Sequence, residues 1–287
     1  MYEIKSKTIL TPQNGLNIYR GRTDELIMLR DVTGGDPMDI GIKYDAASLL
    51  EITLRKKRSR CMIIMGNLGD PYNILEEQLG ITRKCLRIIE TSDCGVVILT
   101  RSELIFRDMD VLHGINSKTK CVITVPISSV DKKIYQGIEG VRSEDPRRRL
   151  DMMERLVDEG FTVIAEYSPM IPYLNYRVDD IRAVIDAIAE TGVKYIDFRG
   201  FKTTLKKSGL EYFKSEYKRR FPKQYVSYDE EYGDSTELKA QSIAECKDLI
   251  DEYADRYNLI CDTDIIKELK RRYENKTEGE QLWITMN

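Results

Sequence analysis

The sequence predicts an α/β protein with a parallel sheet, and two observations carry this prediction. Short apolar runs recur at intervals of 27 to 39 residues, the length of a strand-helix unit. The runs are apolar on both faces, which suits parallel strands buried on both sides. They are Met62–Met65, Gly95–Leu99, Cys121–Val125, Phe161–Ala165 and Lys194–Phe198.

Helical patterns separate these runs. Residues 178–188 carry apolar side chains at helical spacing, and so do residues 150–157. Gly160 and Gly192 follow the two stripes closely, where glycines end helices. Alternating strands and helices predict right-handed crossovers. A barrel, a partial barrel and an open doubly wound sheet all fit this alternation, because the period alone does not choose between them.

The pattern changes after about residue 200. We expect a charged helix, then a loop rich in aromatic residues, then a long amphipathic helix and a short last helix. These segments are 206–220, 221–234, 243–257 and 264–273. We interpret residues 201–287 as a helical C-terminal extension packed on an α/β body formed by residues 1–200.

Composition limits the function classes. The 287 residues carry a net charge of −3, which argues against a protein that coats nucleic acid. No stretch approaches the ~20 apolar residues of a membrane span, and the first residues do not resemble a signal peptide. Six scattered cysteines predict reduced thiols and a cytoplasmic location. His113 is the only histidine, which practically excludes histidine-based metal sites and Ser-His-Asp triads.

The segment Thr11–Gly21 closely resembles the opening of radical S-adenosylmethionine (radical SAM) proteins related to spore photoproduct lyase, a DNA repair photolyase-related subgroup. In that family a tyrosine-arginine-glycine step leads into Cys-x-x-x-Cys-x-x-Cys. Further segments resemble the family in order and spacing over roughly residues 8–200. They are Asp70–Tyr72 with Glu76, Thr82–Leu86, Thr100–Ser102, Arg107–Leu112, Arg147–Arg149 and Ser168–Pro172.

The resemblance implies a partial parallel (βα)6 barrel of radical-SAM type. The first strand would lie near residue 18, and the cluster loop would follow it. In the family, three thiolates of that loop hold a [4Fe–4S] cluster whose open iron binds S-adenosylmethionine.

The three cysteine positions of the resemblance are Arg22, Leu26 and Leu29. Leucine has no donor atom and arginine is a permanent cation, so neither replaces a thiolate. Glu25 and Met28 also depart from the family pattern. We therefore predict no [4Fe–4S] cluster and no cofactor, with S-adenosylmethionine kept as an alternative ligand.

The altered loop has two interpretations. The favoured one is that the apolar run Leu26–Leu29 packs where a cluster would sit. The other is that Arg22 binds an anion in the vacated space, because its guanidinium fork suits anions.

Candidate ligand-binding residues follow the strands or are carried over from the resemblance. They are Asp70, Tyr72, Glu76, Arg101, Ser102 and Glu139. Barrel active sites form at the carboxyl ends of strands. Equally, Asp70 would cap a strand-exit turn, and Arg101 would pair with a carboxylate. A mouth filled by Leu26, Met28 and Leu29 would instead indicate a structural role.

Two function classes remain. The favoured one is a non-catalytic binding or regulatory protein, a pseudoenzyme with a small-molecule or protein partner. The alternative is a spore photoproduct lyase-like enzyme acting on an anionic ligand or S-adenosylmethionine without an intrinsic cluster. Nucleic acid is a less favoured partner, suggested by three basic runs and by the aromatic segment Tyr212–Tyr232. The basic runs are Arg55–Arg60, Arg147–Arg149 and Lys218–Arg220.

Overall fold

The computed structural model describes residues 2–5, 8–12, 15–20, 28, 40–140, 145–239 and 243–276. The chain forms two compact units. Unit 1 comprises residues 1–24, 38–124 and 267–287, and unit 2 comprises residues 25–37 and 125–266. Both units draw on segments from either side of residue 200, so they divide the chain differently from the predicted boundary, which stays a prediction.

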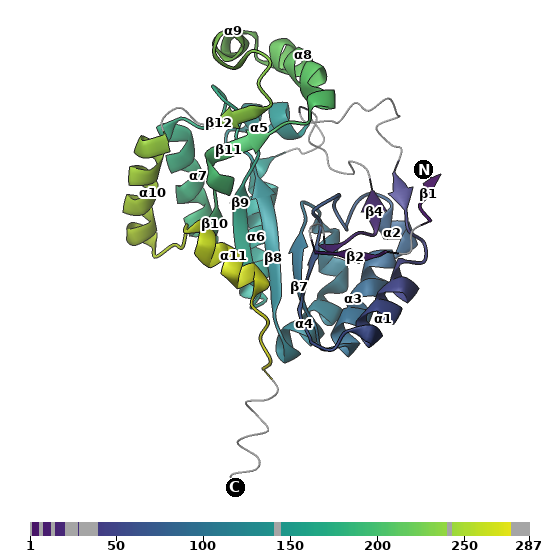
Figure 1. The fold of residues 1–287 in the computed structure, drawn as a ribbon. Coiled ribbons are helices and arrows are strands. Elements are labelled where there is room, and N and C mark those ends of the chain that lie inside the picture. Colours follow the sequence, from purple (N-terminus) through teal and green to yellow (C-terminus); the bar gives the residue numbers. More distant parts are fainter. Residues whose placement is uncertain are drawn as a thin grey trace. The chain divides into compact units, whose positions relative to one another are not determined.

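Unit 1 contains a largely parallel set of strands (Figure 1). Leu16 pairs with Met65, Met62 pairs with Gly95, and Val96 pairs with Cys121. The strands are β2 (Leu10–Thr11), β3 (Gly15–Leu16), β6 (Met62–Met65), β7 (Gly95–Leu99) and the first four residues of β8 (Cys121–Ile127). Among these five described strands, β2 runs antiparallel to its neighbour β3, and the other pairs are parallel.

The helices of unit 1 lie side by side in the order α1, α3, α4 (Figure 1). Their apolar stripes are buried, as the periodicity of amphipathic helices requires. Their bounds are α1 (Ala46–Lys56), α3 (Ile81–Thr91) and α4 (Met109–Lys118), with the short α2 (Glu76–Leu79) and η2 (Glu103–Asp108) between them. A small second sheet joins β1 (Tyr2–Glu3), β5 (Gly41–Ile42) and β4 (Tyr19–Arg20).

Unit 2 contains the rest of β8 and two further parallel strands, β9 (Thr162–Tyr167) and β10 (Tyr195–Asp197). Its helices include α5 (Lys132–Glu139), α6 (Pro146–Asp158), α7 (Val178–Glu190) and α10 (Ile243–Tyr257), of which α7 and α10 pack together. The antiparallel pair β11 (Lys202–Thr204) and β12 (Glu237–Lys239) adds a small ribbon. The 3₁₀ turns η4 (Arg199–Phe201) and η5 (Lys207–Gly209) flank β11, and α11 (Thr263–Arg271) crosses the unit boundary.

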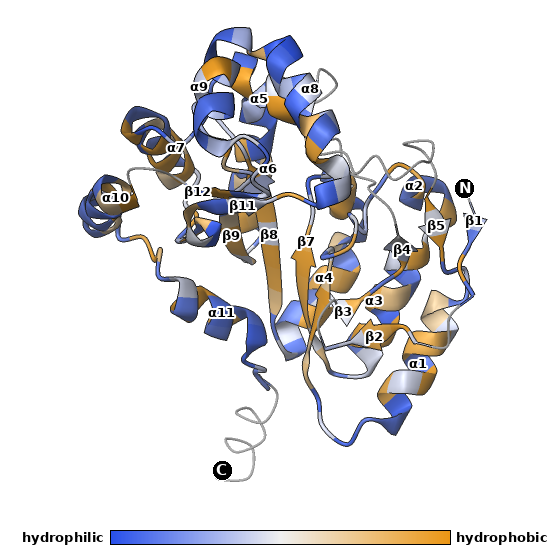
Figure 2. Ribbon diagram, turned by 45° about the horizontal axis from the view of Figure 1, so that its top comes forward, coloured by the Kyte–Doolittle hydropathy of each residue, from blue (hydrophilic) through white to orange (hydrophobic). Residues whose placement is uncertain are grey.

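The structure corrects one expectation in the C-terminal region. Residues 221–234, predicted as a loop, contain the helix α9 (Pro222–Tyr232), which packs against α8 (Leu210–Arg220). Pro222 occupies the first helical turn, where its missing N–H costs nothing. Tyr225, Tyr228 and Tyr232 follow at helical spacing, and Tyr228 is fully buried. Figure 2 shows the mixture of apolar and polar residues along both helices.

The α/β class and the five strands predicted from apolar runs are confirmed. Within each unit the order of the parallel strands follows the chain, which suits a barrel-type sheet and not a doubly wound one. The expected first strand near residue 18 is divided between β3 and β4. Among the described residues no helix is both long and apolar enough to cross a membrane.

Candidate functional site

Asp70 lies in the turn that follows β6 and is almost completely buried. Its Oδ1 accepts hydrogen bonds from the Tyr72 backbone N–H at 2.8 Å and from the Thr100 hydroxyl at 2.7 Å. Its Oδ2 accepts from the Arg101 N–H at 2.7 Å. Burial raises the pKa of this carboxyl, and the three donors oppose the rise. Asp70 therefore ties the exit of β6 to the exit of β7.

Thr100 and Ser102 continue this arrangement at the end of β7. The Thr100 hydroxyl, which donates to Asp70, accepts from the Ser102 N–H at 3.0 Å. The Ser102 hydroxyl in turn accepts from the Leu104 N–H at 3.3 Å and caps the 3₁₀ turn η2. Both hydroxyls thus organise the backbone of the strand exit.

The Tyr72 side chain is buried, and no hydrogen bond of ordinary geometry reaches its hydroxyl among the described residues. Burial, followed by the nearby Asp108 charge, raises the pKa of Tyr72 well above its usual value. This phenol stays neutral at physiological pH.

Glu76, at the start of α2, is fully buried. Its Oε2 accepts from the Tyr19 hydroxyl at 2.5 Å and from the Thr82 N–H at 2.9 Å. Its Oε1 accepts from Arg107 Nη2 at 2.8 Å, and Arg107 Nη1 also donates to the Glu76 carbonyl at 3.0 Å. Burial and the bond to Glu76 raise the pKa of Tyr19. Glu76 therefore joins β4, α3 and η2 through charge-assisted hydrogen bonds.

Arg107 extends the network to two further acidic side chains. Its Nε and Nη2 each donate to the buried Asp108 carboxylate at 2.9 Å. Arg83 also donates to Asp108, at 3.0 Å, and forms a bidentate pair with Asp110 at 2.7 Å for both bonds. The hydrogen bond from Arg83 is the main cause that lowers the pKa of Asp110 to about 2.

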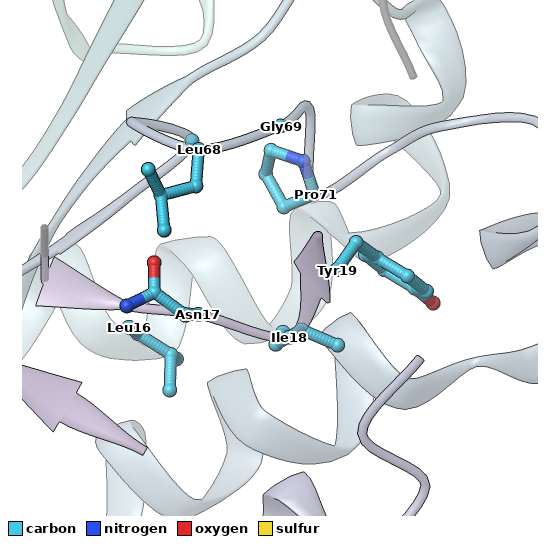
Figure 3. Close-up of a pocket in the computed structure, with 8 residues that line it drawn as sticks. Leu16, Asn17, Ile18, Tyr19, Leu68, Gly69 and Pro71 are labelled. Atoms are coloured by element: carbon cyan, nitrogen blue, oxygen red, sulfur yellow. The ribbon is translucent and has the colours of Figure 1, made fainter. Parts of the chain in front are cut away.

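A small hollow lies beside this network (Figure 3). It contains about 210 Å³ of empty space, including space open to solvent. Asn17 lines it, and its buried Oδ1 accepts no hydrogen bond from the described residues. The Tyr19 hydroxyl points away from Asn17. The hollow is lined by Leu16, Asn17, Ile18, Tyr19, Gly66, Leu68, Gly69 and Pro71.

The structure brings five of the six candidate residues together in unit 1, at the exits of β6 and β7. The sixth, Glu139, belongs to unit 2, at the end of α5. Glu139 is fully buried, and Arg149 lies 3.6 Å from its Oε2. Arg149 also donates to the Tyr135 hydroxyl at 3.2 Å.

Of the altered loop, Arg22, Leu26 and Leu29 lie outside the described residues. Met28 is described and is fully buried in the apolar core of unit 2. Its neighbours in that core come from α5, α8, α9, β12 and the segments that connect α5 to α8. They are Ile138, Ile171, Leu174, Leu205, Leu210, Phe213, Tyr217, Phe221, Tyr228 and Leu238.

The donor set of the chain does not fit a [4Fe–4S] cluster at the position that the resemblance implies. Residues 15–35 contain no cysteine. Cys61 and Cys94 precede β6 and β7, and Cys121 is the first residue of β8, so these thiols mark the amino ends of strands. The others lie in α3, in α10 and after the Tyr195–Ile260 bridge. No group of three or more potential metal ligands occurs in the part of the chain that the structure describes.

Sequence reasoning missed the arginine-carboxylate network. Arg83, Arg107 and Asp108 stood in segments that resemble the family, but nothing local to them indicated a shared partner. The only available signal was that these charged residues stand in segments that an α/β fold is expected to bury. Asn17 carried no signal at all.

No family model matches the chain. An uncharacterized protein of Methanocaldococcus jannaschii is 25% identical over 172 residues, covering 60% of this chain and 61% of the relative. An uncharacterized protein of Mycobacterium tuberculosis is 22% identical over 156 residues, covering 53% of this chain and 46% of the relative. The matches thus span about half to three fifths of each relative.

Solved structures of spore photoproduct lyase are similar over most of the chain. A mutant bound to a dinucleoside spore photoproduct aligns with a TM-score of 0.59 and 12% identity, covering 89% of this chain and 78% of the lyase. A second point mutant gives a TM-score of 0.57 at 13% identity with the same coverage. Together with the mostly parallel sheet, these similarities show that the chain has a radical-SAM-like fold.

Proposed function

We propose that this chain is a cluster-free, non-catalytic binding or regulatory protein built on a radical-SAM-like fold. The observation that carries the proposal is the donor chemistry of the N-terminal loop. Reductive cleavage of S-adenosylmethionine needs an electron from an iron–sulfur cluster, and such a cluster is held by thiolates. Arg22, Leu26 and Leu29 supply none.

The carboxylates at the strand exits support the same proposal. Asp70 and Glu76 each accept at least three hydrogen bonds from within unit 1. A general base or a ligand-binding carboxylate needs lone pairs aimed at its substrate. Here those lone pairs hold backbone turns and arginines in place, which is a structural use of acidic residues.

Met28 supports the proposal independently in unit 2. Its side chain fills part of the core formed with α8 and α9. An apolar residue of the altered loop therefore packs in the core of unit 2.

Anaerobic reconstitution with iron and sulfide tests the proposal. We expect no stoichiometric four-iron loading after gel filtration, and no 5′-deoxyadenosine when reductant and S-adenosylmethionine are added. Near-stoichiometric loading with 5′-deoxyadenosine formation would overturn the proposal.

The matched control is a variant with all three positions restored, Arg22→Cys, Leu26→Cys and Leu29→Cys. If this variant acquires about four irons per chain under the same conditions, the failure of the native chain follows from its missing thiolates. The visible absorption of the two samples, recorded side by side, makes the comparison direct.

Ligand binding distinguishes the proposal from the enzymatic alternative. Equilibrium dialysis with labelled S-adenosylmethionine, followed by chromatography of the recovered ligand, measures binding and turnover together. Recovery of unchanged ligand agrees with a binding protein. Conversion of the ligand without added iron would favour an enzyme that acts without an intrinsic cluster.

Nucleic acid remains a disfavoured partner. Arg55 pairs with Glu51 at 2.6 Å, and Arg219 and Arg220 both pair with Glu216, so part of the basic runs is already neutralised. Phe213, Tyr217 and Tyr228 are buried in the core of unit 2 and present no faces for stacking. We expect no salt-dependent binding of a labelled single-stranded oligonucleotide.

A further inference from the structure

Cys61 and Cys94 form a pair of thiols at the amino ends of β6 and β7. Met62 and Gly95 are register partners in these parallel strands, so the two cysteines occupy the preceding positions side by side. The Gly95 N–H donates to the Cys61 carbonyl at 3.1 Å, which fixes the two backbones against each other.

The backbone spacing suits a disulfide. Neighbouring strands lie about 4.8 Å apart, and disulfides span Cα separations of about 4.4 to 6.8 Å. The two cysteines already occupy neighbouring positions on adjacent parallel strands, so a bond between them requires little movement of the chain.

The two thiols differ in exposure. Cys61 is partly exposed, whereas Cys94 is buried. The Lys57 ammonium, at the end of α1, lies 3.4 Å from Cys61 Sγ. A small oxidant can therefore reach Cys61, whereas Cys94 is the buried second thiol of the pair.

The electrostatics favour a thiolate at Cys61. Interaction with the neighbouring Cys94 thiol and then with the Lys57 ammonium lowers the pKa of Cys61 to about 6, against the opposing effect of burial. The same contact raises the pKa of Cys94, so Cys61 loses its proton first. Arg60 and Asp93, the residues just before the two cysteines, form an ion pair with each other at 2.7 Å.

We infer that Cys61 and Cys94 form a peroxide-reactive thiol pair that closes to an intramolecular disulfide. The Cys61 thiolate attacks one oxygen of a small hydroperoxide, forming a sulfenic acid and releasing hydroxide or alkoxide. Cys94 then attacks the sulfenic sulfur, the S–S bond forms, and the sulfenic oxygen leaves as water with the thiol proton. Two thiols are oxidised and one peroxide O–O bond is reduced.

This site is independent of the proposed function, because it lies at the opposite ends of the strands from Asp70 and Arg101. The bond would enclose the segment from Cys61 to Cys94, which contains β6, α2 and α3. Its closure therefore covalently secures one complete strand-helix unit of unit 1.

The first experiment compares thiols within the native chain. Iodoacetamide labelling at pH 7, read by peptide mass spectrometry over time, should modify Cys61 at least about tenfold faster than Cys261. Cys261 is also partly exposed, but burial raises its pKa to about 12. Equal labelling rates would overturn the inference.

The second experiment follows oxidation. One equivalent of hydrogen peroxide should yield a Cys61–Cys94 disulfide in a non-reducing digest, with two thiols lost and both restored by dithiothreitol. In Cys94→Ala, oxidation should stop at a Cys61 sulfenic acid that dimedone traps, which remains informative if the variant is less stable. A disulfide between any other pair, or no dimedone adduct in this variant, would contradict the inference.

The third experiment tests the lysine. Lys57→Gln should slow labelling of Cys61 severalfold, since the variant lacks the cation beside the thiolate. Lys56→Gln is the matched control, because Lys56 is a neighbouring exposed lysine on α1. If Lys57→Gln labels at the native rate, Lys57 is not part of the site. If both variants are slowed equally relative to the native chain, the effect is one of general surface charge.

Discussion

At the carboxyl ends of β6 and β7 the acidic side chains are buried and fully engaged, whereas at the amino ends of the same strands a thiol lies partly exposed beside a lysine. Asp70 and Glu76 each accept hydrogen bonds from several donors. Cys61 accepts a hydrogen bond from Lys57 and lies beside Cys94 on the neighbouring strand. A radical-SAM-like fold is expected to keep its chemistry at the carboxyl ends. In this chain Asp70 and Glu76 hydrogen-bond to backbone groups and side chains of unit 1, and the thiol pair that we propose as reactive lies at the other end of the strands.

The largest expected loss of stability comes from removing the Glu76 carboxylate near the carboxyl ends of the strands. Glu76→Ala leaves Arg107, Tyr19 and the Thr82 N–H without their buried acceptor. Loss of one partner from a buried ion pair costs about 3–5 kcal/mol. Urea unfolding should report a loss of this size in the free energy of unfolding.

The control is Glu77→Ala, the next residue of the same helix, whose side chain is exposed. It should change the free energy of unfolding by no more than about 0.5 kcal/mol. Similar losses for the two variants would mean that helix α2, and not the buried carboxylate, sets the effect.

The second effect concerns close packing at the exit of β6. Gly66 has a φ of +103°, and an added Cβ would lie 2.3 Å from the Leu99 carbonyl oxygen. Gly66→Ala therefore combines backbone strain with a collision against fixed backbone, and should cost about 3 kcal/mol.

Gly80→Ala separates these two causes. Gly80 also has a positive φ, +60°, but nothing lies within 4 Å of its added Cβ. The strain alone should cost about 1 kcal/mol. If thermal unfolding gives the same loss for both glycines, the contact between Gly66 and Leu99 is not tight.

The success of sequence reasoning differed between these features for physical reasons. The strands β6, β7, β8 and β9 were predictable because apolar runs buried on both faces are a local signal. The bond between Tyr19 and Glu76 joins residues 57 positions apart, so no local pattern contains it. Charged residues at Arg107 and Asp108 resembled family segments, but their pairing depends on the folded backbone.

Helix α9 shows how local signals conflict. Pro222, Gly233 and the many aromatic residues led to the prediction of a loop, although Tyr225, Tyr228 and Tyr232 recur at helical spacing. Burial of Tyr228 against Phe213 and its stacking on Tyr232 favour the helix. Proline and glycine were only the boundaries of that helix. Both residues do limit a helix, but they stand at its two ends, whereas the prediction treated the whole segment between them as a loop.

The third expected loss of stability concerns the hydrogen bond from Thr100 to Asp70 in the interior of unit 1. Thr100→Val removes a hydroxyl donor from the buried Asp70 carboxylate. Removing a hydrogen-bond donor from a buried acceptor lowers the free energy of unfolding by about 1–3 kcal/mol. The free energy of unfolding in urea should fall by this amount.

Thr124→Val is the matched substitution. Thr124 is equally buried on β8, but its hydroxyl has no hydrogen-bond partner in the described portion of the chain. Replacing an unsatisfied hydroxyl by a methyl group should leave stability unchanged or increase it. A large loss for Thr124→Val would mean that the Thr124 hydroxyl contributes to stability, and it would weaken the assignment of Asp70 as the decisive partner of Thr100.

The smallest effect lies at the solvent edge of the network. Asp110 is more than half exposed, and Arg83 lowers its pKa to about 2 from an ordinary value near 3.8. A carboxyl whose folded pKa is lowered binds its proton more weakly in the folded state. Its stabilising contribution is therefore complete above about pH 4 and is lost as the pH falls from about 4 to 2.

Asp110→Asn should remove this contribution. The difference between the native chain and the variant should be on the order of 0.5 kcal/mol at pH 6, because an exposed ion pair is weak and is screened by salt. The difference should shrink as the pH falls from 4 to 2, and also in 1 M sodium chloride. Glu77→Gln serves as the control for loss of one exposed negative charge. A difference that stays constant down to pH 2 would show that Asp110 contributes through packing or through the helix start of α4, and that the charged network ends at the buried Asp108.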